Sequence, residues 1–212
     1  MKTLSIVTAW WNHLDLLPDY KKVIDESCAD EVIVIDNGSE PAFECDQFKV
    51  IRNNTNRGFS RANNQGLRAA KSDVVLFLNN DIRSTVVGFR IWSPDLLYNV
   101  GKGILVGAQL RNDAHTMVDG IAMQYLDGWC LAGMRQDLID LGGWDESYLE
   151  PSYYGDNDLC LRAQKAGMQL IQVDLPIIHA SNTTSKIFDL SGVTPANYIK
   201  FASKVREWRR VK

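Results

Sequence analysis

Residues 73–81 read DVVLFLNND, and this stretch decides the fold class that the sequence predicts. Its apolar residues run without interruption from Val74 to Leu78, which is typical of a strand that is covered on both faces in a parallel sheet. The run stops abruptly at Asn79, Asn80 and Asp81. Ligands of open α/β sheets bind beyond the carboxyl ends of the strands, so these three polar residues are the first candidates for a site.

Two earlier apolar runs end in the same way. Residues 4–8 (LSIVT) are followed by Ala9, Trp10 and Trp11, and residues 31–36 (EVIVID) end in Asp36 before the turn Asn37-Gly38-Ser39. Helical spacing of apolar residues over about 14–27 and 60–70 separates the strands, and residues 49–52 predict one more short strand. The first half therefore predicts an α/β fold with a Rossmann-like, mostly parallel central sheet flanked by helices.

The second half is less regular and contains no internal repeat. Its patterns predict helices near 90–99, 135–141, 157–166 and 195–210, and strands near 104–110 and 170–173. A polar stretch at 111–119 and the segment 128–134 stand between them without an assigned element. We interpret the chain as one domain over residues 1–212, with a nucleotide-binding half (1–82), an acceptor and sugar half (83–190) and a C-terminal helix (191–212).

Composition limits the classes of partner. The 212 residues are 45% hydrophobic and carry a net charge of −3, so the chain lacks the overall positive charge that gathers nucleic acid. Its four cysteines form no C-x-x-C pair, which favours a reducing, cytoplasmic location. No apolar run approaches the roughly 18 residues that span a bilayer, so membrane contact is expected only at the periphery.

The strand ends suggest a nucleotide site. Trp11 offers a flat ring for a nucleobase, Asp36 can accept a hydrogen from the base or ribose, and Asp81 can hold a hard divalent cation through oxygen. Arg57 and Gly58 stand just before a predicted helix, whose N-terminus would favour a diphosphate. Each residue alone is more often a turn or cap residue, and Ser60 may simply cap this helix.

The second half supplies two further candidates. Asp156 stands where a loop enters a predicted helix and could remove a proton from an acceptor hydroxyl, whereas we assign Asp158 to helix capping. His179 follows an apolar segment and could reach the same metal as Asp81, although a lone histidine is more often structural. Neither G-x-G-x-x-G after the first strand nor a P-loop motif occurs, which disfavours dinucleotide dehydrogenases and P-loop enzymes.

Taken in order, seven segments resemble glycosyltransferase family 2, the inverting enzymes of the GT-A fold, and particularly its rhamnosyltransferase-like members. The resemblance covers about residues 3–185. It rests on SIVTAWWN (5–12), VIVIDNGS (32–39), NRGFSRANNQGL (56–67), LFLNND (76–81), GWCLAGMRQDLIDLGGWDE (128–146), GDNDLCLRAQKAG (155–167) and IIHASNTTS (177–185).

The resemblance implies roles for individual residues. It implies a nucleotide-sugar site at Ala9, Trp10, Trp11, Asp36, Arg57, Gly58, Asn79, Asn80 and Asp81, with Asp81 and His179 as ligands of Mn²⁺ or Mg²⁺. Asp156 matches the general base, and the sugar and acceptor side would include Trp129, Trp144, Asp145 and Glu146. The chain departs from the family at Trp10-Trp11, where Thr-Tyr is usual, and at Gly155, which replaces the glutamate of the E-D pair.

The implied activity is transfer of a sugar from a nucleotide-sugar donor to an acceptor hydroxyl, on a glycan or another molecule. Two alternatives remain open: a non-catalytic GT-A module that binds a nucleotide or glycan, and a sugar nucleotidyltransferase. The second needs a glycine- and lysine-rich loop after the first strand, where Ala9-Trp10-Trp11 stands instead.

The C-terminal helix has two possible roles. Apolar residues recur at helical spacing (Tyr198, Phe201, Val205 and Trp208) and basic residues fill the rest. The helix could pack on the domain, or it could lie on an anionic membrane or a partner.

Overall fold

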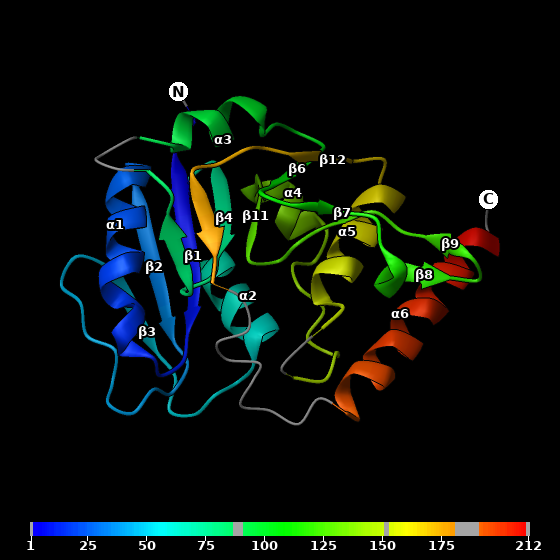
Figure 1. The fold of residues 1–212 in the computed structure, drawn as a ribbon, viewed down its shortest axis with the longest axis horizontal. Coiled ribbons are helices and arrows are strands. Elements are labelled where there is room, and N and C mark those ends of the chain that lie inside the picture. Colours follow the sequence, from blue (N-terminus) through cyan, green and yellow to red (C-terminus); the bar gives the residue numbers. More distant parts are fainter. Residues whose placement is uncertain (1, 87–90, 151–152, 181–190, 211–212) are drawn as a thin grey trace.

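A computed structural model describes residues 2–86, 91–150, 153–180 and 191–210. Its centre is a seven-stranded sheet in the order β12-β6-β11-β4-β1-β2-β3 (Figure 1). Strand β11 (Cys130–Met134) pairs antiparallel with both of its neighbours, and all other pairs in this sheet are parallel. The predicted mostly parallel central sheet is confirmed.

The sheet separates two apolar cores because its central strands are buried on both faces. Residues Leu4, Ile6 and Trp10 of β1 (Leu4–Trp10) face one core, which includes helix α1 (Leu17–Ser27). Val7 of the same strand faces the other core, which includes α2 (Phe59–Ala69) and α5 (Gly155–Lys165). This alternation along β1 determines which of its side chains can reach the carboxyl end of the sheet.

Most predicted elements lie within one or two residues of their observed bounds. Strands β2 (Glu31–Asp36) and β3 (Lys49–Arg52) are exactly as predicted, whereas β1 runs on to Trp10. The remaining larger elements are β4 (Val74–Leu78), α3 (Ser93–Asn99), β6 (Ile104–Gly107), α4 (Arg135–Asp140), β12 (Gln169–Gln172) and α6 (Val193–Arg210). The predicted start of α3 at Arg90 and the last part of the seventh segment, residues 181–185, lie outside the described residues.

The sequence analysis missed several very short strands. Strand β5 (Ile82–Ser84) pairs with β13 (Ile177–His179), and β7 (Leu110–Arg111) pairs with β10 (Tyr125–Leu126). The stretch 111–119, expected to be irregular, contains a 3-10 turn at Ala114–Thr116 and strand β8 (Met117–Val118), which pairs with β9 (Ile121–Ala122). Strands of two or three residues are too short to show a periodicity.

Helix α6 packs on the domain beside α5 and the β8–β9 hairpin (Figure 1). Phe201 and Val205 are fully buried in a third apolar cluster. Several basic residues of the helix pair with the domain: Lys204 contacts Asp145 and Asp158, Arg209 donates to the Val118 carbonyl, and the exposed Arg206 pairs with Asp119. The packing role of the helix is therefore observed, and the contact with a membrane or partner stays a prediction.

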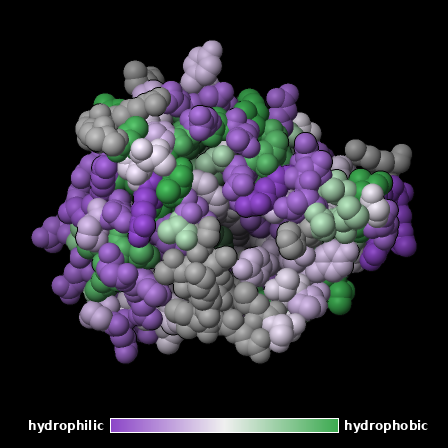
Figure 2. Space-filling model, viewed as in Figure 1, coloured by the Kyte–Doolittle hydropathy of each residue, from purple (hydrophilic) through white to green (hydrophobic). Residues whose placement is uncertain are grey.

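Hydrophobic side chains on the visible face lie in small groups separated by hydrophilic ones (Figure 2). Within the described residues, the helices are either too short or too polar to cross a bilayer.

Candidate active site at the carboxyl ends of the strands

The metal candidates Asp81 and His179 lie side by side. The antiparallel pairing of β5 with β13 brings them together: His179 pairs with Ile82, and the Ala180 amide donates to the Asp81 carbonyl at 2.7 Å. His179 Nε2 lies 2.9 Å from Asp81 Oδ1 and 3.2 Å from Asn79 Nδ2. Both side chains are largely buried. Two residues almost a hundred positions apart are thus held at one point beyond the end of β4.

This pair has the chemistry and spacing of two ligands of one divalent cation. Two ligands at adjacent positions of an octahedral ion, each about 2.1 Å from it, are about 3 Å apart. Carboxylate oxygen and imidazole nitrogen suit Mn²⁺, and carboxylate oxygen suits Mg²⁺. Among the described residues, no cluster of three or more His, Cys, Asp or Glu side chains could hold a metal by itself. The pair therefore fits an ion that completes its coordination with ligand phosphates and water.

Asp156 stands in the first turn of α5 with its carboxylate held from two sides. Oδ2 accepts from the Gly128 amide at 3.0 Å, and Oδ1 accepts from the Asn157 amide at 2.9 Å. Desolvation by burial raises the pKa of Asp156 to about 6, and the charge of Asp127 acts in the same direction, while the two amides oppose the shift. A carboxylate with a pKa near working pH is suited to act as a general base.

A three-residue loop, Asp127 to Trp129, connects the base to the metal candidates. The Gly128 amide holds Asp156, the Trp129 ring stacks on His179 at 5.2 Å and 2°, and the Trp129 carbonyl accepts from the Asn79 amide at 2.8 Å. Trp129, predicted on the sugar side, thus lies within the site. The loop leads directly into β11, whose antiparallel direction puts its start at the same sheet edge as the end of β4.

Asp127 is a charged residue of the site that the sequence analysis missed. Both of its carboxylate oxygens accept from Arg111 Nε at 2.7 Å. Burial raises the pKa of Asp127, and Arg111 and His179 oppose the shift. No motif marks this residue, because its partner Arg111 is 16 positions away and is brought close only by the pairing of the short strands β7 and β10.

On the donor side, two predicted residues have other roles. Trp10 is fully buried, its ring packs against Tyr20 and Phe43, and its indole donates to the Asn12 carbonyl at 2.6 Å. This corrects the prediction that Trp10 helps to hold the nucleotide, because its side chain lies with those of Leu4 and Ile6 in the core on the α1 side of the sheet. Ala9 and Trp11 are partly exposed at the strand end, and Asn80 is buried beside Asp81.

Asp36 is also fully enclosed. Its oxygens accept from the amides of Ser39 at 2.9 Å and Phe43 at 3.1 Å, and Arg52 pairs with it. Burial by itself would raise the pKa of Asp36, but the hydrogen bonds from Ser39, Phe43 and Arg52 together lower it. Asp36 therefore holds the loop after β2 in shape, which corrects the prediction that it accepts a hydrogen from a base or ribose.

The N-terminus of α2, predicted to hold a diphosphate, is occupied by a protein carboxylate. Glu150 Oε1 accepts from the Ser60 amide at 3.1 Å. Gly58, with φ +90°, precedes the helix, and a Cβ there would meet Glu150 Cγ at 2.2 Å. Ser60 is not the N-cap. Arg57 is exposed and Gly58 is partly buried beside Glu150, and their contact with a diphosphate stays a prediction.

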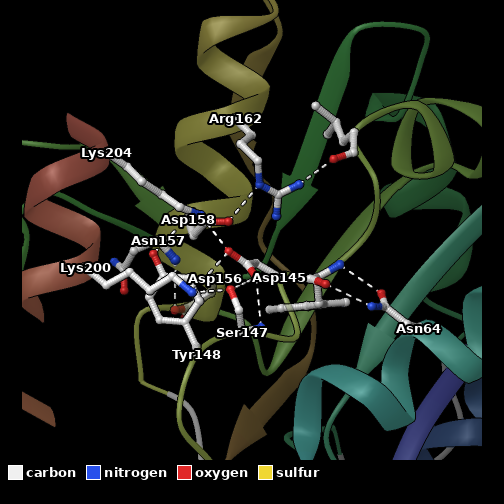
Figure 3. Close-up of polar contacts among 12 residues, drawn as sticks. Asn64, Asp145, Ser147, Tyr148, Asp156, Asn157, Asp158, Arg162, Lys200 and Lys204 are labelled. Carbon is white, nitrogen blue, oxygen red and sulfur yellow. Dashed lines mark hydrogen bonds and ion pairs between the residues drawn. The ribbon is translucent and has the colours of Figure 1, made fainter. Parts of the chain in front are cut away.

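Three of the predicted acceptor-side residues serve packing and ion pairs. Trp144 is buried between Phe59 and Phe77. Glu146 accepts from Asn64 at 2.9 Å. Asp145 pairs with Lys204 at 2.6 Å (Figure 3); hydrogen bonds from Lys204 and Ser147 lower its pKa even though burial opposes them.

Asp158 belongs to the same network and does not cap α5. It is fully buried and accepts from Arg162 Nε at 2.7 Å and from the Tyr148 hydroxyl at 3.2 Å, and Lys204 pairs with it (Figure 3). Asp156 and Asp158 therefore point to different surroundings, one into the site and the other into an ion-pair network.

Residues 5–85 match the model of the family described as glycosyl transferase family 2. The fold is GT-A, since the arrangement also resembles those of solved GT-A glycosyltransferases. GalNAc-T7 with UDP, GalNAc and Mn²⁺ superposes with a TM-score of 0.72 at 15% identity, over 96% of this chain and 48% of that chain.

Two other solved structures are similar. The mannosyltransferase PcManGT from Pyrobaculum calidifontis, in complex with GDP-Man and Mn²⁺, gives a TM-score of 0.57 at 16% identity, over 81% of this chain and 54% of that one. Glucosyl-3-phosphoglycerate synthase from Mycobacterium tuberculosis, with Mn²⁺, UDP and phosphoglyceric acid, gives a TM-score of 0.61 at 20% identity, over 95% of this chain and 78% of that one. The chain spans about half the length of the first two. No curated protein matches it.

Proposed function

We propose that the chain is a metal-dependent, inverting glycosyltransferase that moves a sugar from a nucleotide-sugar donor to an acceptor hydroxyl. The observation that carries the proposal is a single site in which one short loop joins the Asp81–His179 pair to the half-buried carboxylate of Asp156. The family 2 match over residues 5–85 and the nucleotide and Mn²⁺ complexes of similar folds support it.

Asp81 and His179 would hold Mn²⁺ or Mg²⁺. When bound, the ion would neutralise negative charge on the departing nucleoside diphosphate. Trp11 directly follows β1 and is partly exposed, and its ring would stack on the nucleobase.

Asp156 takes the proton of the acceptor hydroxyl. The oxygen then bonds to the anomeric carbon as the bond to the nucleoside diphosphate breaks, which inverts that carbon in one displacement. The raised pKa makes Asp156 a stronger base than an ordinary aspartate while leaving it ionised near neutral pH. Asp145 does not compete for this role, because Lys204 holds its charge.

A panel of UDP-, GDP- and dTDP-sugars, each with and without Mn²⁺, tests the donor side by thermal shift and calorimetry. We expect binding that requires the cation and is lost in Asp81→Ala. Metal-independent binding that Asp81→Ala leaves unchanged would overturn the metal assignment. Binding without transfer to any of a broad set of hydroxyl acceptors would instead indicate a non-catalytic GT-A module.

A further inference from the structure

The backbone that leads into the base-bearing helix is held by one buried side chain from the far end of the sequence. Asn197, in the first part of α6, is 1% exposed. Its Oδ1 accepts from the Leu149 amide at 2.9 Å, and its Nδ2 donates to the carbonyls of Leu149 at 2.9 Å and Tyr153 at 3.1 Å. One amide thus joins two backbone positions that lie seven and three residues before Asp156.

The next turns of α6 contact the residues on either side of Asp156, Tyr154 and Asp158. Tyr154, which precedes α5 with φ +75°, packs its ring against Phe201 at 5.6 Å and against Tyr198 at 5.8 Å. Left-handed backbone at a tyrosine is unfavourable and persists only where the surroundings hold it. One turn further on, Lys204 pairs with the buried Asp158 (Figure 3). Helix α6 therefore contacts the chain on both sides of Asp156.

Asn197 differs from the other contacts because it acts on backbone. An amide side chain supplies an acceptor and two donors from one short stem, and no other side chain of this size does so. The packed rings and the ion pair can shift by rotamer changes, whereas these three hydrogen bonds fix where the backbone passes. The amide therefore sets the point from which α5 starts.

We propose that Asn197 is a positioning residue for sugar transfer: by fixing the backbone at Leu149 and Tyr153, it sets the start of α5 and so the direction of the Asp156 carboxylate. The inference rests on the proposed role of Asp156 as general base. It gives the C-terminal helix, which lies outside the matched residues 5–85, a part in the reaction.

Loss of these hydrogen bonds should displace the general base without changing the binding of the donor. A misplacement of about 1 Å at a reacting group costs up to about 100-fold in rate. The donor candidates lie on other elements, at the ends of β1 and β4 and on β13. We therefore expect Asn197→Ala to lower kcat by about 10- to 100-fold with an unchanged donor KM.

The pH profile gives a second readout. The titratable groups that act on Asp156 or respond to its charge are Asp127, Tyr125, Tyr154 and Cys160. A loosened entry to α5 admits water and lowers the Asp156 pKa toward its ordinary value. The acidic limb of the kcat profile should then move to lower pH, which a merely destabilised protein would not show.

The test compares Asn197→Ala and Asn197→Asp with Arg206→Ala. Aspartate keeps the acceptor for the Leu149 amide and loses both donors. Arg206 lies on the same helix, but its ion pair with Asp119 is exposed and distant from the loop, so its loss serves as the control. Transfer kinetics across pH, donor affinity and hydrogen exchange of a peptide covering 149–158 are measured for all variants.

We expect both Asn197 variants to lose kcat, to shift the acidic limb and to exchange faster at 149–158, while Arg206→Ala behaves like the parent. An Asn197→Ala protein that keeps the parent's kcat, pH profile and exchange would overturn the inference. If Asn197→Ala does not fold, Asn197→Asp decides by the same criteria. If the parent transfers no sugar, the proposed function is contradicted. The hydrogen-exchange rates of residues 149–158 still test whether Asn197 fixes the backbone before α5.

Discussion

The difference in folding stability between the parent and Asp156→Asn should depend on pH in a defined direction. Burial raises the pKa of this carboxyl from its ordinary 3.8 to about 6. Folded protein therefore binds the proton more tightly than unfolded protein between about pH 4 and 6, and the parent loses stability as pH rises through this window. A shift of about 2 units corresponds to about 3 kcal/mol.

Asparagine resembles the protonated carboxyl, because each keeps one carbonyl oxygen that can accept a backbone amide from Gly128 or Asn157. At pH 4 the folded parent is mostly protonated at Asp156, so the two proteins should differ little in stability. At pH 7.5 the parent is ionised there, and Asp156→Asn should be more stable by about 3 kcal/mol.

Urea unfolding of both proteins at the two pH values measures this difference. The other ionisable groups are common to both proteins, so they largely cancel in the comparison. A stability difference that is the same at pH 4 and pH 7.5 would refute the claim that burial raises the pKa of Asp156.

Three further perturbations probe other parts of the site. Asp81→Ala should abolish the Mn²⁺ dependence of nucleoside diphosphate binding by calorimetry without lowering the melting temperature, and an affinity equal to the parent's contradicts the metal assignment. Gly128→Ala places a Cβ 3.2 Å from Asp156 Cβ and should displace the Asp156 carboxylate, so kcat should fall about 10- to 100-fold at unchanged donor affinity. An unchanged kcat would mean that transfer does not depend on the close approach of Gly128 to Asp156. Lys204→Met leaves Asp158 buried with one cation fewer and should cost about 3 kcal/mol in urea unfolding, whereas a loss below about 1 kcal/mol would show that Arg162 suffices.

The sequence predicted the fold and the main chemical groups of the site for the same reason. Continuous apolar runs identify strands covered on both faces, and polar residues directly after such runs must lie at the ligand-binding edge. Asp81 was a candidate because it follows the end of a predicted strand, and Asp156 because it stands at the start of a predicted helix. His179 was a candidate because it follows an apolar segment, but the three-residue strand that brings it to Asp81 has no periodicity of its own, so the pairing of β13 with β5 could not be predicted.

The errors have equally specific causes. Trp10 belongs to a strand that runs two residues further than predicted, so its ring follows Ile6 into the core. Trp144 was taken for a site residue although a tryptophan between two other aromatic rings is a core residue. Asp127 and Asn197 were missed because their roles depend on partners, Arg111 and the Leu149 backbone, that only the tertiary structure brings close.

The most direct test of the account is sugar transfer by the parent and by Asp156→Asn, measured as nucleoside diphosphate release and as product with Mn²⁺ and the donor found in the panel. Removal of the general base should lower kcat by about 10²- to 10⁴-fold while nucleotide affinity stays within about twofold of the parent's. Full activity of Asp156→Asn in a protein that binds the donor normally would contradict the assignment of Asp156 as the group that takes the acceptor proton.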